Sequence, residues 1–183
     1  MPILLINACV REESRTMVLA RRVLEEMEGE VTELALASLG LAPLDRVSLA
    51  RRDSLLREGR WDDPMLRYAR QFAEAEEIVI AAPFWDLSFP ALLKVYLEQI
   101  AVAGITFRYV EGRPVGLCRA KRLTYVTTSG GPITEDFGYT YVKALARSFY
   151  GIGSTRAVRA MKLDMLGIPS AELLTRAEIS VIE

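Results

Sequence analysis

The sequence predicts an α/β fold built on a doubly wound parallel sheet, and two observations indicate it. Strand-like apolar runs alternate with helix-like stretches five times along the 183 residues. The run from 78 to 82 is apolar without alternation, which is typical of a strand buried on both faces. The length and a hydrophobic content of 51% predict that residues 1–183 form one domain with a sizeable core.

The first half of the chain carries three predicted strands. Residues 2–7 are a short apolar run, and residues 30–36 alternate apolar with polar, as in an outer strand. Pro83 ends the third strand because proline cannot donate to a sheet ladder. Apolar residues at helical spacing, and an Asp-Asp-Pro cap at 62–64, predict the helices between them. These are 15–27, an exposed Arg-rich stretch at 48–59, and 65–73.

The second half repeats the alternation. The predicted helices are 91–100, 139–150 and one that opens at Ser170, and the predicted strands are 121–128 and a weaker one at 155–161. The polar, turn-rich segment 104–116 receives no element. Five parallel strands with helices on both faces predict the flavodoxin-like order 2-1-3-4-5.

The composition excludes several classes of function. With 23 basic and 24 acidic residues, the chain has a net charge of −1, so neither nucleic acid nor a membrane is an expected partner. There is no predicted signal peptide or spanning segment, and Cys9 and Cys118 form no disulfide framework, so we expect a cytoplasmic protein. The absence of histidine excludes a Ser-His-Asp triad and a His-ligated zinc, and no metal site is expected.

Three loops should open onto one crevice, because ligands bind at the carboxyl ends of strands flanking the switch point. They are 8–16, 83–90 and 128–135. The first offers hydroxyls, arginines and free N–H groups at a helix start, which together suit a phosphate monoester. The residues concerned are Arg11, Ser14, Arg15 and Thr16. Equally, Ser14 could simply cap the helix.

The other two loops could form walls for a flat ring. Phe84 and Trp85 are aromatics in a loop, where binding is a common role, although two stray surface aromatics are the plainer interpretation. Gly130 and Gly131 let backbone approach a ligand closely, although a tight turn explains them equally well. A phosphate site beside two such walls predicts flavin mononucleotide, FMN.

Four blocks of sequence carry a family resemblance, namely 11–16, 83–86 with 90–94, 103–109 and 128–131. Through them, residues 1 to about 152 resemble the FMN-dependent NAD(P)H:quinone oxidoreductases and azoreductases of the flavodoxin-like superfamily. The resemblance implies FMN, NADH or NADPH as donor, and a homodimer with active sites at the interface. It also implies ping-pong two-electron reduction of quinones and of azo or nitroaromatic compounds.

The resemblance further implies roles for single residues. Phe107 and Tyr109 would position the substrate, with no acid or base assigned. The cofactor-binding residues would be Cys9, Arg11, Ser14, Arg15, Thr16, Pro83, Phe84, Trp85, Asp86, Thr128, Ser129, Gly130 and Gly131. An FMN-binding electron carrier or regulatory subunit is the alternative, although a net charge of −1 does not favour an acidic carrier. A flavin-free α/β scaffold is the third class.

The sequence departs from the family at three places. Cys9 stands where a hydroxyl residue is common, and no histidine follows the glycine pair. The third departure is Asp86, where the family commonly has Asn. An ionised carboxylate accepts hydrogen bonds but cannot donate them. Its charge would oppose negative charge on a reduced flavin. A protonated carboxyl group could instead donate, as buried carboxylic acids sometimes do.

Overall fold

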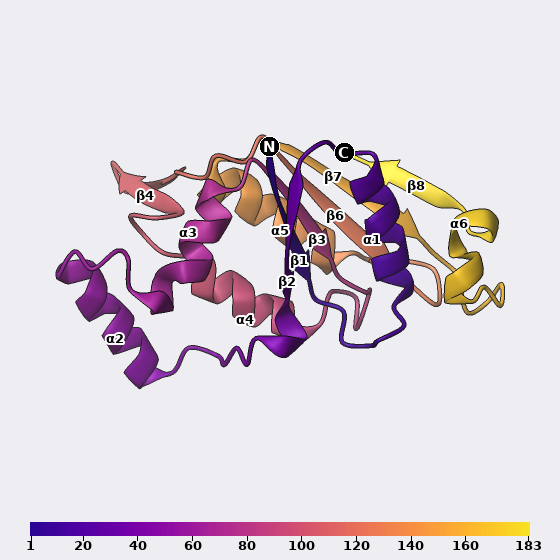
Figure 1. The fold of residues 1–183 in the computed structure, drawn as a ribbon, viewed down its shortest axis with the longest axis horizontal. Helices are drawn as coiled ribbons and strands as arrows, with labels where there is room; N and C mark the ends of the chain where they lie inside the picture. The colour runs from indigo at the N-terminus through magenta and orange to yellow at the C-terminus, as the bar shows by residue number, and fades with distance from the viewer.

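A six-stranded sheet in the order β2-β1-β3-β6-β7-β8 forms the centre of the computed structural model, which describes residues 1–183 (Figure 1). Its five parallel strands are β1 (Pro2–Asn7), β2 (Glu30–Ala35), β3 (Glu77–Ala81), β6 (Arg122–Thr128) and β7 (Ser154–Ala160). Their order confirms the predicted 2-1-3-4-5. The predicted count of five was wrong, because β8 (Ile179–Ile182) adds an antiparallel edge strand beside β7.

Six α-helices and four short helical turns connect the strands. They are α1 (Arg15–Glu25), η1 (Leu36–Ser38), α2 (Arg46–Arg57), η2 (Pro64–Leu66), α3 (Arg67–Glu74), α4 (Ala91–Ile100), α5 (Phe137–Leu145), η3 (Ala146–Tyr150), η4 (Ser170–Glu172) and α6 (Leu173–Arg176). The predicted final helix is therefore short and gives way to β8. No helix has both the length and the apolar character needed to cross a bilayer.

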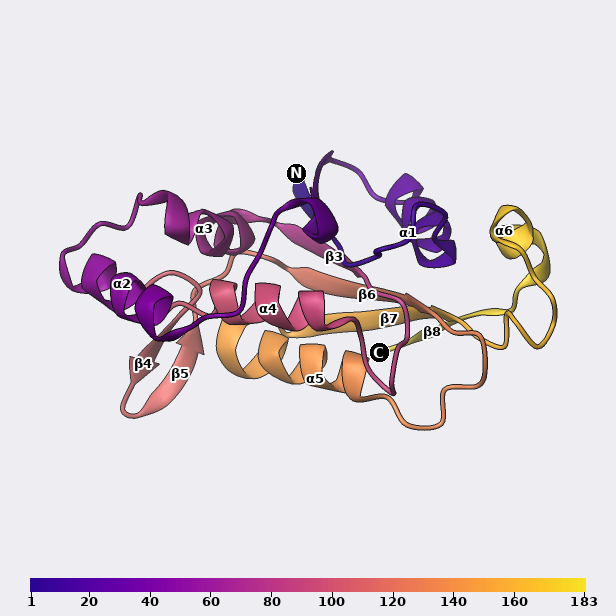
Figure 2. The same cartoon turned by 90° about the horizontal axis from the view of Figure 1, so that it is seen from below.

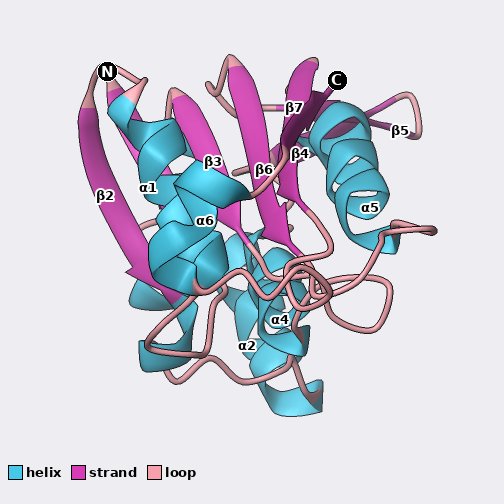
Figure 3. Cartoon of the chain, turned by 90° about the vertical axis from the view of Figure 1, so that its right-hand side faces the viewer, coloured by secondary structure: helices cyan, strands magenta, loops and turns pink.

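Alternation along the central strands divides the core into two layers. In β1, Ile3 and Leu5 belong to one apolar cluster, and Leu4 and Ile6 belong to the other, because successive side chains point to opposite faces. The first cluster packs under α1 and α6, which lie side by side (Figure 3). The second packs under α4 and α5, which lie together on the other face (Figure 2). Both layers leave the carboxyl edge of the sheet to loops.

The segment predicted to be without structure contains a β-hairpin. Strands β4 (Phe107–Val110) and β5 (Arg113–Gly116) pair antiparallel around Glu111 and Gly112, whose φ angles are 51° and 76°. The hairpin lies at the end of the molecule opposite α1 and α6 (Figures 1 and 2). Phe107 was expected outside any core element, but it is buried and stacks edge-on against Phe149, with ring centroids 5.1 Å apart.

Candidate functional site

The loops that follow β1, β3 and β6 enclose a pocket of about 220 Å³ at the carboxyl edge of the sheet. We call it the flavin pocket, after the ligand predicted for it. All predicted cofactor-binding residues line it except Asp86, Ser129 and Gly131, and Val10, Glu13 and Asp164 complete the lining. The structure thus brings the three predicted loops together. That these residues hold a cofactor stays a prediction.

The first turn of α1 supplies the donors of this pocket. Ser14 caps the helix, its Oγ accepting a hydrogen bond from the Met17 N–H at 3.3 Å. The N–H groups of Arg15 and Thr16 have no partner within the helix, because the first turn has no preceding carbonyls. The Ser14 hydroxyl still carries a proton that it can donate. The capping interpretation of Ser14 is therefore correct and compatible with a bound anion.

Thr16 connects two of the loops. Its buried hydroxyl lies 2.7 Å from the Thr128 hydroxyl, at the end of β6. Ser129, also buried, donates from its hydroxyl to the Gly131 carbonyl at 2.6 Å. This bond shapes the turn that the glycine pair forms, so Ser129 acts on the loop and not on the pocket surface.

Arg15 is paired with a residue that the sequence did not reveal. Its Nη2 lies 2.7 Å from Asp164 Oδ1, and its Nη1 donates to the Ile168 carbonyl at 3.3 Å. A Cβ on Gly130 would lie 2.0 Å from Asp164 Oδ2, so a larger residue there would require this carboxylate to move. Asp164 follows β7, whose carboxyl end opens onto the same edge as β6, and that parallel arrangement was the available signal. Arg11 is exposed and forms no ion pair.

A tight turn carries the aromatic wall. The N–H of Trp85 donates to the Ser88 carbonyl at 3.1 Å, and the Ser88 N–H returns a bond of 2.7 Å. Asp86 and Leu87 both have left-handed φ, 50° and 64°, as in a type I′ turn. Aspartate and asparagine tolerate this conformation, so Asp86 has a structural reason to be there. Its side chain is exposed and forms no ion pair with Arg11, Arg15 or Arg108.

Cys9 is the buried thiol of the flavin pocket, with 8% of its surface exposed. Its Sγ donates to the Ala81 carbonyl at 3.7 Å. Burial raises the pKa of the thiol, and hydrogen bonds from Ser14 and Thr16 oppose that shift only in part. Cys9 is therefore a neutral thiol and places no negative charge beside the anion-binding donors. No cluster of three or more His, Cys, Asp or Glu residues is arranged to hold a metal ion.

Phe107 and Tyr109 do not line the flavin pocket of their own chain. Phe107 is buried in the hairpin, and Tyr109 is 61% exposed, stacked edge-on against it with centroids 5.5 Å apart. Their role in substrate positioning stays a prediction, and it requires the hairpin of a second subunit to reach the pocket.

Three comparisons with known proteins agree with this geometry. Residues 1–179 match the model of a family described as having a flavodoxin-like fold. The FMN-dependent NADH:quinone oxidoreductase 2 of Clostridium acetobutylicum is 37% identical over 178 residues, covering 90% of this chain and 88% of that protein. An azoreductase from Bacillus anthracis str. Sterne superposes with a TM-score of 0.78 at 23% identity, over 96% of this chain and 93% of that one.

A further solved structure carries the predicted ligand. The FMN-dependent NADH-azoreductase from Bacillus anthracis str. Ames Ancestor, solved in complex with FMN, superposes with a TM-score of 0.73 at 25% identity. The match covers 89% of this chain and 88% of that one. The chain therefore belongs to the flavodoxin-like family of FMN-dependent NADH:quinone oxidoreductases.

Proposed function

We propose that this protein is an FMN-dependent NAD(P)H oxidoreductase that reduces quinones and azo or nitroaromatic compounds by two electrons in a ping-pong cycle. The observation that carries the proposal is the convergence of helix N–H groups, hydroxyls and aromatic rings in one pocket at the carboxyl edge of the sheet. The names of the relatives support both the cofactor and the class of acceptor.

The residues of the flavin pocket suit the two ends of FMN. The first-turn N–H groups, with Ser14, Thr16 and Arg11, would hold the phosphate through charge-assisted hydrogen bonds. Phe84 and Trp85 would flank the ring system. When bound, FMN would supply hydride acceptance from the nicotinamide and return of two electrons to the acceptor, chemistry that requires no histidine.

The absorbance spectrum of the purified protein tests the proposal. We expect flavin bands that bleach on addition of NADH, and steady NADH oxidation once menadione is present. Bleaching without turnover would support the alternative of an electron carrier. A colourless protein that takes up no added FMN would contradict the cofactor itself.

Initial rates at varied NADH and menadione test the ping-pong order. Parallel lines in a double-reciprocal plot are expected, because the two substrates would use one pocket in turn. Intersecting lines would show that both substrates bind before reaction and would contradict the proposed order.

We also propose a two-fold homodimer, the commonest symmetric assembly. Exposed apolar side chains next to the flavin pocket support it, since such patches are typical of interfaces. Phe89, Phe137 and Tyr141 line a groove of about 380 Å³ there, and Phe137 is 57% exposed. Sedimentation should give twice 20.4 kDa, whereas a 20.4 kDa species alone would contradict the dimer. Phe137→Glu should give monomers, and Val47→Glu, on the exposed side of α2, should not.

One further proposal concerns the cellular compartment and the domain organisation of the chain. Cys9 and Cys118 are both free thiols, which supports a reducing compartment, the cytoplasm. We propose that residues 1–183 act there as one domain. A single unfolding transition in urea, seen equally by flavin absorbance and circular dichroism, is the expected result.

A further inference from the structure

A second pocket, larger than the flavin pocket, lies between α2, the loop 39–45, the start of α3 and the end of α4. Its volume is about 480 Å³, within the range of small-molecule sites. Three arginines line it, namely Arg51, Arg52 and Arg67, and we call it the arginine pocket. It shares no lining residue with the flavin pocket, so it is a separate feature of the molecule.

Two of these arginines have no carboxylate partner. Neither Arg52 nor Arg67 forms an ion pair, whereas Arg51 and Arg60 of the neighbouring segment do. The Nε of Arg52 is buried and has no hydrogen-bond partner, and its Nη1 reaches only the Glu98 carbonyl at 3.4 Å. A buried donor left without a partner is unfavourable, so the arrangement lacks an acceptor.

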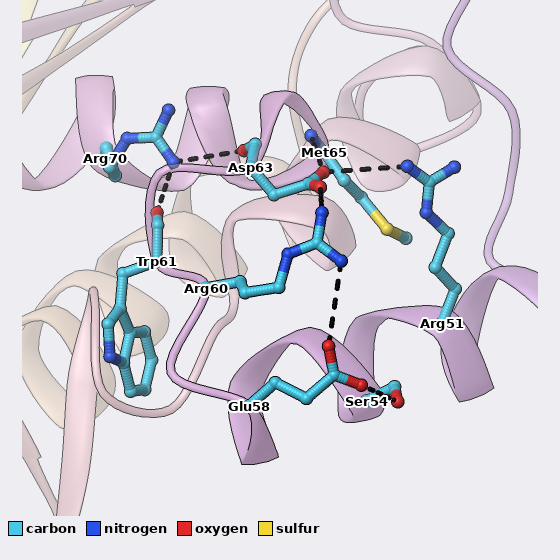
Figure 4. A network of polar contacts seen from close by, with 8 residues as sticks. All are labelled: Arg51, Ser54, Glu58, Arg60, Trp61, Asp63, Met65 and Arg70. Atoms are coloured by element: carbon cyan, nitrogen blue, oxygen red, sulfur yellow. Dashed lines mark hydrogen bonds and ion pairs between the residues drawn. The ribbon is translucent and has the colours of Figure 1, made fainter.

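The acidic residues nearby are already engaged. Asp45, the acid of the pocket lining, caps α2 and accepts from the Ser48 N–H at 2.7 Å. Arg51 lies 3.7 Å from Asp63, but that carboxylate is closer to Arg60, at 3.1 Å (Figure 4). The pocket lining therefore carries three guanidinium groups against one carboxylate, an excess of positive charge.

Contacts within the protein hold both the Arg67 guanidinium and the loop that forms one wall of the arginine pocket. The Arg67 guanidinium lies over the Tyr68 ring, 4.5 Å from its centroid, and donates to its hydroxyl. The loop wall is fixed by Gln99, whose Nε2 donates to the Ala42 carbonyl at 2.8 Å. Half-buried Leu41 and Met65 add apolar surface. Groups positioned in advance lose little entropy when a ligand arrives.

We propose that the arginine pocket binds a small organic anion. Its phosphate or carboxylate group would lie between Arg52 and Arg67, because the planar guanidinium matches both groups in a two-bond geometry. Its apolar part would pack against Leu41 and Met65. This ligand differs from the FMN of the proposed function and occupies a different site.

Calorimetric titration of the FMN-saturated protein tests the proposal, since FMN keeps the flavin pocket occupied. The probes are adenosine monophosphate, benzoate and inorganic phosphate. We expect one site per chain that takes an organic anion more tightly than inorganic phosphate. Tighter binding of adenosine monophosphate would identify the anionic group as a phosphate, and tighter binding of benzoate would identify it as a carboxylate. Flavin absorbance recorded during the titration should not change.

Matched variants locate the binding. Arg52→Gln and Arg67→Gln should each weaken it at least tenfold, since each loses charge-assisted hydrogen bonds. Arg57→Gln, also on α2 but outside the lining, should stay within twofold of the parent. Thermal melting checks that each variant folds. If Arg52→Gln does not fold, Arg67→Gln still tests the proposal, because Arg67 is exposed and its replacement should not disturb the core.

Several results would overturn the proposal. One is the absence of saturable heat from every probe up to roughly 10 mM, the weak end of specific binding. Another is unchanged affinity in both variants. Displacement of FMN by the probe would assign the binding to the flavin pocket instead. Equal affinity for phosphate and the organic anions would remove the role given to Leu41 and Met65.

Discussion

The flavin pocket and the arginine pocket both carry arginines, but they use them differently. Arg15 in the flavin pocket is bound to Asp164 at 2.7 Å, so part of its charge connects the start of α1 to the loop after β7. Arg52 and Arg67 in the arginine pocket have no such partner. In the flavin pocket the donors left free are N–H groups, hydroxyls and the exposed Arg11, which forms no ion pair. The comparison indicates that the pairing of each arginine, more than the number of arginines, distinguishes structural charges from charges that await a ligand.

The largest expected effect tests the hydroxyls of the flavin pocket. The double variant Ser14→Ala, Thr16→Ala should lose about a hundredfold in FMN affinity, because two hydrogen bonds to a charged group are removed. Fluorescence titration of the apoprotein with FMN measures it. Thr16→Ser, which keeps the hydroxyl, and Ser148→Ala, on the exposed side of η3, are the controls. Unchanged affinity in the double variant would mean that the phosphate lies elsewhere.

The second effect tests the buried thiol, for which the arginine pocket has no counterpart. Because burial raises the pKa of Cys9, the folded chain keeps this proton at a pH where an unfolded chain, with a thiol pKa of about 8.5, has lost it. The buried neutral thiol therefore makes its full contribution to stability below the pKa of the unfolded chain. That contribution falls as the pH rises from there through the higher pKa of the folded chain. Between neutral and strongly alkaline pH, the wild type should lose more of its free energy of unfolding than Cys9→Ser does. Urea unfolding across pH measures the difference, and parallel curves would contradict it.

The third effect compares the two kinds of arginine directly. Arg15→Met should lower the free energy of unfolding by about 0.5 kcal/mol, the range of an ion pair with one exposed partner, here Asp164. Arg52→Met should raise it slightly, because a partly buried charge without a partner is replaced by an apolar side chain of similar length. Arg57→Met on the same helix sets the baseline. Equal losses in Arg15→Met and Arg52→Met would contradict the distinction between the pockets.

The smallest effect concerns Asp86 at the rim of the flavin pocket. Asp86→Asn keeps the left-handed turn but removes a negative charge, so it should raise the midpoint potential of bound FMN. The rise should be on the order of tens of millivolts, because solvent screens the field of an exposed charge. Asp86→Ala should raise it similarly and also weaken the turn. Potentiometric titrations of the three proteins measure both. Identical midpoints at every pH would show that the turn lies away from the flavin.

The parallel sheet was predictable because burial on both faces demands unbroken apolar runs such as 78–82. The edge strand β8 was not, because its four residues are largely exposed and pair only with β7. The strand β5 contains Pro114, which argues against a strand within a sheet but is tolerated in an edge hairpin. Such strands depend on tertiary contacts that a local pattern does not report.

Some residues of the flavin pocket could likewise be predicted from local sequence patterns, and others could not. Hydroxyls at a helix start and glycines after a strand are local signals, so Ser14, Thr16 and Gly130 could be predicted to lie together. The partner of Arg15 lies 149 residues away, and no spacing rule connects them. The arginine pocket was missed for a related reason, because its residues look like an ordinary exposed helix until α3 and α4 close around them.

The burial of Cys9 also bears on how long such a protein remains intact while it works. Flavins pass electrons to dioxygen as well as to organic acceptors, so an oxidant can form beside the ring. Sulfur is oxidised chiefly as the exposed thiolate. Cys9 has neither property, since it is 8% exposed and its pKa is raised by burial. Burial of Cys9 should therefore slow the oxidation of its sulfur by such an oxidant.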